Sequence, residues 1–260
     1  MSDPRLTPDP ALMTLNRPAQ VAVPVADLCR RPDGPRDRQV LFGEPLTVLH
    51  EASGWAYVQA EKDGYCGHVL QRALSIPRKA THRVCVPATH AYTSADLKSP
   101  DLLSLSFGSP VTVTAETKDF AETPQGHIPR GHLAPVDSHE EDPAQIAALF
   151  LGTPYLWGGN SRWGIDCSGL VQAALLACGI PCPGDSDQQE KTVGAPVSGA
   201  YQRNDLLFWK GHVALVVDAE TMIHANAHAM AVSYENITDA IARIEAGGDG
   251  PVTAHRRPGV

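Results

Sequence analysis

The chain has 260 residues, enough for one large domain or for two to three small ones. Its apolar share of 43% and charged share of 19% are typical of a soluble globular protein. A formal net charge of −8 argues against nucleic acid as a partner, and no apolar run approaches the length of a membrane span. We therefore expect neither a nucleic acid nor a membrane partner.

The first 20 residues are predicted to form an N-terminal extension. The stretch "MSDPRLTPDPALMTLNRP" has neither the basic region nor the continuous apolar core of a signal peptide, so we expect a cytoplasmic protein. Its six cysteines are then expected to be reduced thiols. Cys178 and Cys182 have no second pair at metal-site spacing, which favours structural thiols. No metal and no cofactor are expected.

An internal repeat divides the first half into residues 21–79 and 80–138. "LFGEPLTV" at 41–48 returns as "SFGSPVTV" at 106–113, and "YCGHVLQRAL" at 65–74 returns as "PRGHLAPV" at 129–136. Short β-branched runs broken by Gly and Pro, without a helical period, predict two small β-barrels. The second is degenerate, because it lacks the tryptophan of "GWAYVQ".

The composition changes at residue 139, and residues 139–260 are predicted to be α+β. Asp142 followed by Pro143 starts a helix that Gly152 ends. "GIDCSGLVQAALLACGI" at 164–180 has helical apolar spacing. Four short runs, "DLLFW", "HVALVVD", "TMIHA" and "MAVSYE", predict antiparallel strands, and "NITDAIARIEAGG" predicts a closing helix.

Cys167 lies in the first turn of the predicted helix at 164–180. Unpaired backbone N–H groups and the helix dipole favour an anion there, so we expect the thiol's pKa to fall and the thiolate to be a nucleophile. The same N–H groups can hold the oxyanion formed when a carbonyl is attacked. A second interpretation, that Cys167 only completes the apolar face of the helix, is equally compatible with this segment alone.

Two histidines favour the nucleophile. His212 and His224 lie on two predicted strands joined by a turn near Asp218, so their side chains share one face of a hairpin. One imidazole can accept the thiol's proton while the other orients it. A single strand histidine such as His212 is more commonly structural. His228 lies in a predicted loop or strand, where metal chelation with His224 is not favoured.

The segments "PYLWGGNSRWGIDCSGLVQ" and "NDLLFWKGHVALVVDAETMIHA" resemble the NlpC family of bacterial cell-wall cysteine peptidases, which are papain-like in fold. The first half resembles bacterial SH3-like domains. The resemblance implies that Cys167 is the nucleophile, His212 the base and His224 the third polar residue. Tyr155 matches a tyrosine that lies beside the nucleophile in that family. Asn204 stands where the family usually has glycine, which concerns a turn.

Two SH3-like modules before the catalytic domain resemble the subset that cleaves the γ-D-glutamyl–diamino acid bond of short peptidoglycan peptides. In that subset Asp166 and Ser168 would help to hold the free L-alanyl amine, although Asp166 is equally well explained as a helix N-cap. Glu44 and Tyr65 of the first barrel would close the amine end. The alternative to these roles is that Glu44 is a solvated carboxylate in a turn and that Tyr65 has no role in the site.

The resemblance implies a papain-like catalytic domain at 139–260 preceded by two SH3-like barrels. It also implies a γ-D-glutamyl-L-diamino acid endopeptidase that acts on soluble L-Ala-γ-D-Glu-diamino acid peptides in peptidoglycan recycling. Three alternatives stay open: an endopeptidase on intact cell-wall peptidoglycan, an inactive peptide-binding module and a metal-dependent hydrolase. The acidic charge disfavours the first, and the complete set of Cys167, His212 and His224 disfavours the second.

Overall fold

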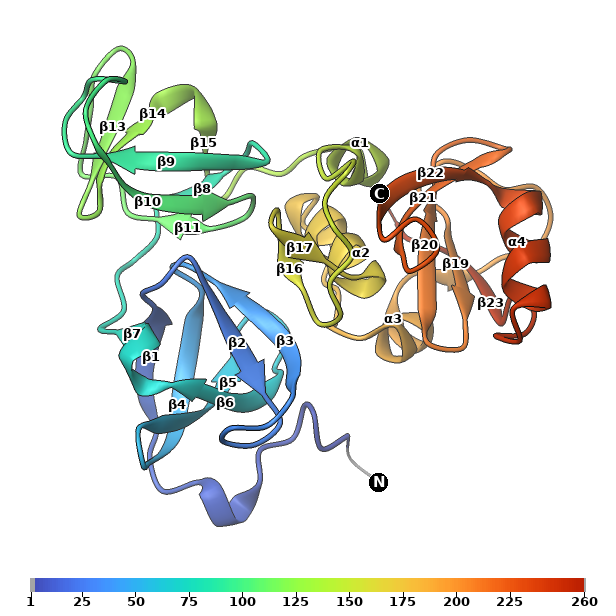
Figure 1. The fold of residues 1–260 in the computed structure, drawn as a ribbon, viewed down its shortest axis with the longest axis horizontal. Helices are drawn as coiled ribbons and strands as arrows, with labels where there is room; N and C mark the ends of the chain where they lie inside the picture. The colour runs from blue at the N-terminus through green and yellow to red at the C-terminus, as the bar shows by residue number, and fades with distance from the viewer. Residues whose placement is uncertain (1–2, 260) are drawn as a thin grey trace. The chain divides into compact units, whose positions relative to one another are not determined.

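The computed structural model describes residues 3–259, and the chain divides into two compact units, Met1–Ser138 and His139–Val260 (Figure 1). The first unit is built from strands and the second from helices and one larger sheet. Within residues 3–259, no helix combines the length and the apolar character that crossing a membrane requires.

The first lobe of the first unit is one antiparallel sheet in the order β3-β2-β6-β5-β4-β1-β7. Alternating side chains of its strands, such as Leu46 and Val48 of β4, point into a shared apolar core. Ser53 and Gly54 both have positive φ, as the two-residue turn of the β4–β5 hairpin requires. The strands are β1 (Arg17–Val21), β2 (Val25–Cys29), β3 (Arg36–Leu41), β4 (Pro45–Ala52), β5 (Trp55–Ala60), β6 (Cys66–Leu70) and β7 (Leu74–Ser75).

The second lobe of the first unit has two antiparallel sheets, ordered β10-β9-β14-β13-β12 and β11-β8-β15. Its strands are shorter, and its core is smaller than that of the first lobe. They are β8 (His82–Val84), β9 (Ala88–Tyr92), β10 (Asp101–Ser106), β11 (Pro110–Val111), β12 (Ala115–Glu116), β13 (Phe120–Thr123), β14 (Gly126–Pro129) and β15 (Leu133–Pro135). The described residues of this unit, 3–138, also include three short 3-10 helices, at Pro10–Leu12, Gln71–Ala73 and Arg130–His132.

The repeated Phe-Gly motif forms the same turn in both lobes. Gly43 and Gly108 have φ of +77° and +83°, a conformation that glycine adopts without strain. A Cβ on Gly43 would lie 2.1 Å from the carbonyl oxygen of Pro110, so the first turn packs directly on the second. Phe42 accordingly joins the apolar core of the second lobe. The internal repeat is thus also a contact between the two lobes.

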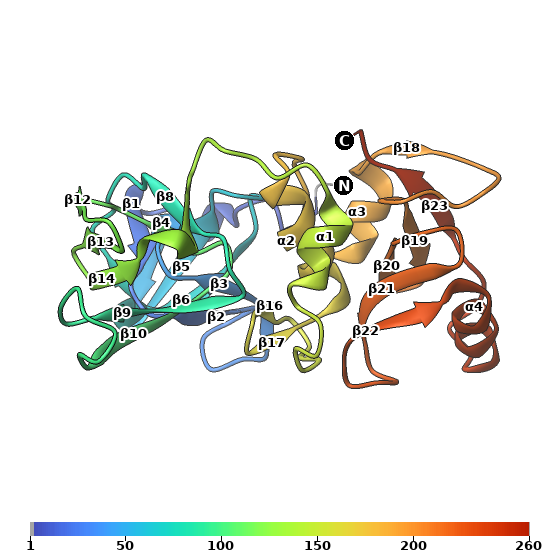
Figure 2. The same cartoon turned by 90° about the horizontal axis from the view of Figure 1, so that it is seen from above.

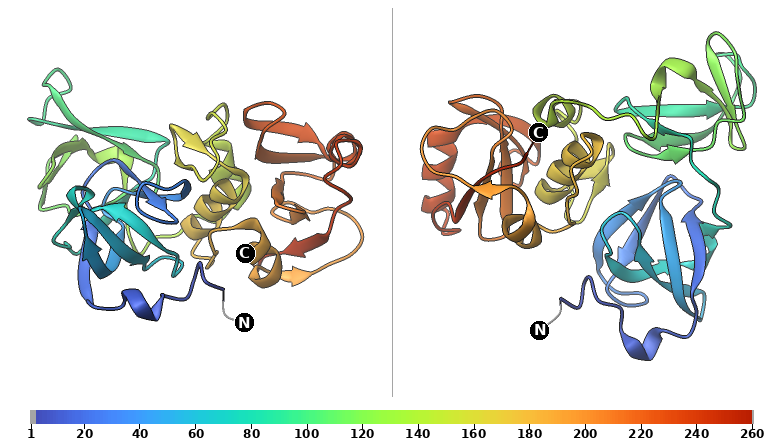
Figure 3. Two further views of the ribbon diagram at one scale, coloured as in Figure 1. Left: turned by 60° about the horizontal axis from the view of Figure 1, so that its bottom comes forward. Right: turned by 180° about the vertical axis from the view of Figure 1, so that it is seen from behind.

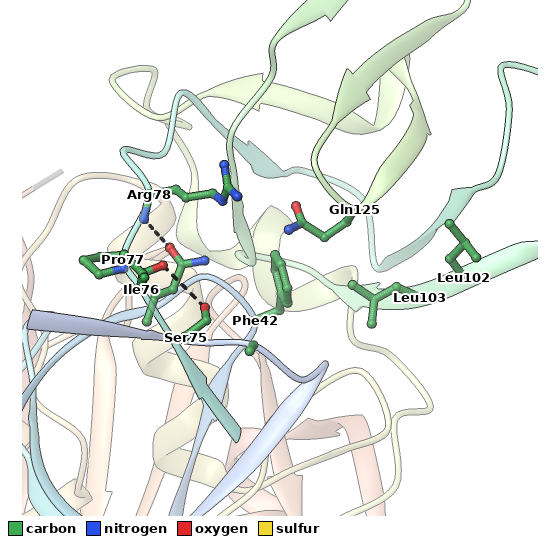
Figure 4. Close-up of a pocket in the computed structure, with 10 residues that line it drawn as sticks. Phe42, Ser75, Ile76, Pro77, Arg78, Leu102, Leu103 and Gln125 are labelled. Carbon is green, nitrogen blue, oxygen red and sulfur yellow. Dashed lines mark hydrogen bonds between the residues drawn. The ribbon is translucent and has the colours of Figure 1, made fainter. Parts of the chain in front are cut away.

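A cavity of about 930 Å³ lies beside Phe42 (Figure 4). The segment from Ser75 to Arg78 lines it together with Leu102, Leu103 and Gln125, and all ten lining residues belong to the first unit. The Arg78 backbone N–H donates to Oε1 of Gln20 over 2.6 Å, which fixes that segment against β1. The lining is mainly apolar and holds Arg78 as its only charged side chain among the lining residues.

The second unit is a six-stranded antiparallel sheet in the order β18-β23-β19-β20-β21-β22, with helices on both faces. Figures 2 and 3 show α1, α2 and α3 on one face and α4 on the other. The helices are α1 (Pro143–Ala148), α2 (Cys167–Ala177), α3 (Ser186–Thr192) and α4 (Ile237–Ala246). The sheet contains β18 (Ala195–Pro196), β19 (Leu206–Trp209), β20 (His212–Val216), β21 (Thr221–Asn226), β22 (Ala231–Asn236) and β23 (Ala254–Arg257), and β16 (Asn160–Ser161) pairs with β17 (Gly164–Ile165) outside it.

The helix and strand predictions for the second unit are confirmed to within a few residues for most elements. The predicted end of the first helix at Gly152 was wrong: α1 ends at Ala148, because the next N–H groups, from Leu149 to Leu151, bond to carbonyl groups three residues back instead of four. Asp142 caps α1, with Pro143 in its first turn, and Asn236 caps α4. Gly179, which follows α2, has φ of +73°, as a helix C-terminus favours. Asn204 has φ of +72°, so it takes the left-handed turn conformation that the expected glycine would adopt.

Five elements of the second unit were not predicted from the sequence: α3, β23 and the two-residue strands β16, β17 and β18. α3 begins with a capping box between Asp185 and Gln188, a signal present in the polar stretch before the strands. β23 is polar, and it inserts between β18 and β19 although it comes last in the chain. Asp205 holds it in place: its carboxylate accepts from Nε2 of His255 over 2.7 Å and from Nε of Arg257 over 2.6 Å.

Replacing Asp205 with asparagine should destabilise the second unit. Asp205 is fully buried, and although burial alone would raise its pKa, hydrogen bonds from Arg257 and His255 hold that pKa below its ordinary value. We expect the free energy of unfolding to fall by about 3 kcal/mol. This is the lower end of the range for breaking a buried ion pair, because the side chains of Arg257 and His255 keep some access to water. Urea unfolding measures the loss, and Asp239→Asn on exposed α4 surface is the control. An unchanged midpoint would contradict the assignment.

Candidate active site

Asp166 fixes both the start of α2 and the loop before it. Its Oδ1 accepts from the Gly169 N–H over 2.6 Å and from the Ser168 hydroxyl over 3.1 Å. Its Oδ2 accepts from the Gly158 N–H over 2.9 Å. The side chain is only 8% exposed, and its N-cap role is observed directly. The cap thereby locks Cys167, the first residue of α2, in one orientation.

Glycines bring the loop backbone against the first turn of α2. A Cβ on Gly169 would lie 2.5 Å from the Gly159 carbonyl oxygen, and a Cβ on Gly159 would lie 2.5 Å from that of Gly164. No side chain larger than hydrogen fits at either position without moving backbone atoms. The glycines on both sides of Cys167 therefore serve this close packing.

Cys167 is only 6% exposed and its thiol lies among backbone N–H groups. The N–H groups of Val213, Ser168 and Cys167 itself lower the thiol's pKa, but burial and the neighbouring Asp166 carboxylate outweigh them and raise it to about 12. The expected lowering of this pKa was therefore wrong, because the helix N-terminus is buried together with the thiol. Cys167 is protonated at neutral pH.

His212 and His224 are hydrogen-bonded to each other across the predicted hairpin. β20 pairs with β21 in the register Leu215 with Ile223, which sets the two histidines diagonally on one face. Nε2 of His212 lies 2.9 Å from Nδ1 of His224. Trp209, opposite His212 on β19, covers its ring with the centroids 5.7 Å apart. The prediction that both imidazoles share a face is confirmed.

Both imidazoles are neutral at neutral pH. Burial lowers the pKa of His212 to about 3, and the charges of His224 and Arg243 act in the same direction. Burial also lowers the pKa of His224 to about 4, although Glu235 opposes it. A neutral imidazole carries one unprotonated nitrogen, so it can accept a proton from a neighbouring thiol. The resting site thus holds a neutral thiol and a neutral base.

Glu235 extends this network and was not predicted from the sequence as a site residue. Its Oε2 lies 2.9 Å from Nε2 of His224. Arg243 of α4 donates to both carboxylate oxygens, from Nε over 2.8 Å and from Nη2 over 2.7 Å. The β21–β22 register, Met222 with Glu235, places the carboxylate diagonally from His224. Without that register the sequence shows only an acid at the end of a strand.

Tyr155 lies near the thiol and the cap. A single bridge pairs it with Ile165, just before Asp166. Burial raises the pKa of the Tyr155 hydroxyl well above its ordinary value, and Cys167, once ionised, and the Asp166 carboxylate raise it further. The hydroxyl is therefore a permanent donor on this side of the site.

Glu44 and Tyr65 belong to the first unit, unlike the six other predicted site residues. Glu44 is 8% exposed, which overturns its interpretation as a solvated turn carboxylate. Its Oε1 accepts from Nζ of Lys62 over 2.7 Å, and its buried Oε2 has no hydrogen-bond partner among residues 3–259. Tyr65 is 3% exposed in the core of the first lobe, with the guanidinium carbon of Arg38 5.7 Å from its ring centroid.

Within residues 3–259, the structure contains no group of three or more His, Cys, Asp or Glu side chains arranged to hold a metal ion. His228 is exposed in the loop after β21.

A helix that begins with a buried thiol, packed against an antiparallel sheet that carries a histidine pair, defines a papain-like cysteine peptidase. Residues 152–244 match the NlpC/P60 family, and residues 28–74 match the bacterial dipeptidyl-peptidase SH3 domain. The chain is 31% identical over 230 residues to the gamma-D-glutamyl-L-lysine dipeptidyl-peptidase of Bacillus subtilis, covering 78% of this chain and 76% of that protein. The chain belongs to the NlpC/P60 family.

Two further relatives extend over most of the chain. Dipeptidyl-peptidase 6 of Lysinibacillus sphaericus is 26% identical over 231 residues, which cover 77% of this chain and 84% of that protein. The crystal structure of an NlpC/P60 family protein from Bacillus cereus superposes with a TM-score of 0.79 at 21% identity, over 93% of this chain and 99% of that one. The likeness to that structure shows a shared fold.

Proposed function

We propose that this cysteine peptidase hydrolyses the γ-D-glutamyl–diamino acid bond of peptidoglycan-derived peptides that begin with a free L-Ala. The observation that carries the proposal is the 31% identity to a gamma-D-glutamyl-L-lysine dipeptidyl-peptidase, which extends over 230 residues. Muropeptide recycling in the cytoplasm suits such a substrate. Six free cysteines are consistent with a reducing compartment.

The proposed domain organisation follows the repeat and the two compact units. The sequence repeat gives residues 1–20 as an extension, residues 21–79 as the first SH3-like barrel and residues 80–138 as a second, degenerate one, although β1 of the first barrel already begins at Arg17. Residues 139–260 form the peptidase domain. The matching Phe-Gly turns at Gly43 and Gly108 support the second barrel, because they follow equivalent strands of the two lobes.

In the proposed mechanism, His212 takes the proton from the thiol as Cys167 Sγ attacks the γ-carbonyl carbon of D-glutamate. Backbone N–H groups at the start of α2 stabilise the oxyanion. The C–N bond then breaks, and His212 returns the proton to the amine of the leaving diamino acid. Water, activated by His212, hydrolyses the thioester and releases L-Ala-γ-D-Glu. His224 holds His212 in orientation through their 2.9 Å hydrogen bond.

The proposed specificity concerns the substrate's free α-ammonium group. Asp166 would attract it by charge, and Ser168, whose hydroxyl donates to Asp166, has lone pairs left to accept. Tyr155 would donate to a substrate carbonyl, and Glu44 and Tyr65 are the residues of the first barrel that the family resemblance assigns to the amine end. The buried Oε2 of Glu44 supports this role, because a carboxylate oxygen without a donor costs stability that an ammonium group would restore.

A comparison of free and N-acetylated L-Ala-γ-D-Glu-L-Lys tests the proposal. The free peptide should release L-Ala-γ-D-Glu, which mass spectrometry identifies. N-acetylation removes the positive charge, and losing one charge-assisted contact should lower kcat/KM by about 10- to 100-fold. The meso-diaminopimelate peptide, run in parallel, identifies the preferred diamino acid. Equal rates for free and acetylated peptides would contradict the amine pocket and favour the endopeptidase on intact peptidoglycan.

Glu44→Gln is the matched variant for this comparison. The amide keeps an oxygen for Lys62 but loses the negative charge, so it should reduce the penalty of N-acetylation. Glu61→Gln provides a control in the same lobe. A penalty unchanged by Glu44→Gln would remove Glu44 from the amine pocket without affecting the peptidase assignment.

A further inference from the structure

Three side chains on three neighbouring strands form one diagonal line across the sheet. His212 of β20, His224 of β21 and Glu235 of β22 are joined by two hydrogen bonds of 2.9 Å each. Arg243 closes the line by donating to both oxygens of Glu235. Because side chains alternate along each strand, the two registers place all three on one face of the sheet, with His212 at the first position of β20.

The carboxylate at one end determines which nitrogen carries each proton. Hydrogen bonds from Arg243 lower the pKa of Glu235, so it is ionised at neutral pH and can only accept. His224 must therefore donate through Nε2–H, which leaves its Nδ1 unprotonated. That nitrogen accepts from His212, which must carry its proton on Nε2. The remaining nitrogen of His212, Nδ1, is then unprotonated and free to act as a base.

We propose that Glu235, held by Arg243, is a positioning residue that fixes the tautomers of both histidines so that His212 offers a bare Nδ1 to the thiol of Cys167. The inference rests on the proposed roles of Cys167 and His212. It assigns a function to Glu235, the acid that is hydrogen-bonded to His224. It also explains why Arg243 is paired with that acid at the edge of the site.

Glu235 also balances charge during the reaction. When the Cys167 S–H bond breaks and an N–H bond forms at Nδ1, His212 becomes an imidazolium with both nitrogens protonated. No proton leaves His224, so the positive charge stays on His212 and is stabilised through His224 by the carboxylate. The other titratable groups that act on this network are Arg243 of α4, His228 after β21 and Asp166 beside the thiol.

Nitrogen-15 NMR of histidine-labelled protein tests the tautomers without any substrate. His212→Gln and His224→Gln assign the signals. In the wild-type protein at pH 7, both histidines should show a protonated Nε2 and an unprotonated Nδ1. In Glu235→Gln the amide can donate as well as accept, so the fixed pattern should give way to a mixture. A protonated Nδ1 on His212 in the wild-type protein would overturn the proposal.

Alkylation of Cys167 by iodoacetamide at pH 6 gives an independent readout, because the neutral reagent reports the population of thiolate paired with imidazolium. Glu235→Gln should slow alkylation by about 10- to 100-fold, the loss expected for one charge-assisted hydrogen bond. Glu235→Asp, which keeps the charge, should restore part of the rate. Asp239→Asn, an exposed acid on α4, should leave it unchanged.

The alkylation outcomes separate this inference from the proposed function. If Glu235→Gln reacts as fast as wild type, or if Glu235→Asp reacts no faster than Glu235→Gln, the positioning role is wrong. Suppose instead that iodoacetamide alkylates Cys167 of the wild-type protein faster than that of Glu235→Gln, but the wild-type protein cleaves neither the free nor the acetylated peptide. The proposed substrate is then wrong, and the positioning role of Glu235 stands. Thermal unfolding of each variant shows whether a lost rate reflects a lost fold.

Discussion

Replacement of Cys167 by serine should abolish peptide hydrolysis, with kcat/KM falling by at least about ten-thousandfold. A serine hydroxyl has a much higher pKa than a thiol, and a base as weakly basic as His212 is poorly matched to it. The change is nearly isosteric at a site that is 6% exposed, so the fold should be retained. Release of L-Ala-γ-D-Glu, with thermal unfolding alongside, measures both effects.

Cys178→Ser is the control for this substitution. Cys178 follows α2 at its other end and has no proposed role in the reaction. It should keep full activity. Hydrolysis retained by Cys167→Ser, or lost equally in both variants, would show that Cys167 is not the nucleophile.

Removal of the base should have the second largest effect. His212→Ala should lower kcat/KM by about 10²- to 10⁴-fold, the usual contribution of a positioned general base. His224→Ala should cost less, because it removes only orientation, and His224→Gln should keep part of the activity through an amide hydrogen bond to His212. Full activity in His212→Ala would refute its assignment as the base.

The low pKa of the base gives this prediction a pH signature. Burial lowers the pKa of His212 to about 3, so the base stays unprotonated far below pH 6.5, and kcat/KM should hold through pH 5. Folding stability, unlike kcat/KM, should change with pH in this range. The unfolded chain binds protons at His212 and His224 below about pH 6.5 while the folded chain does not, so stability falls as pH drops from there toward 4. An acid limb of kcat/KM centred near 6.5 would contradict the burial of the base.

The parts of the fold that local patterns specify were predicted well. The helix at Cys167 has its cap, its apolar period and its terminating glycine within one continuous segment, and the structure has all three. The hairpin that carries His212 and His224 could also be predicted from the sequence, because a short turn fixes which residues of the two strands share a face. The Phe-Gly repeat identified a turn that recurs at Gly43 and Gly108.

The parts that depend on long-range pairing were missed. β23 is recognised only through Asp205, some fifty residues earlier, because its own sequence is polar. Glu235 joins the site through the register of a strand pair and through Arg243 of the following helix, and neither contact has a local signal. The pKa of Cys167 was mispredicted for a similar reason, since its burial arises from packing that the helix sequence does not encode.

The most direct test of the central claim is covalent labelling by a substrate-shaped probe. L-Ala-γ-D-Glu in which a diazomethyl ketone replaces the scissile amide should inactivate the enzyme with one equivalent bound. Digestion and mass spectrometry should then find the adduct on the peptide that contains Cys167, and Cys167→Ser should not be labelled. An adduct on any of the other five cysteines, or no adduct in an enzyme that still cleaves the free tripeptide, would contradict the account.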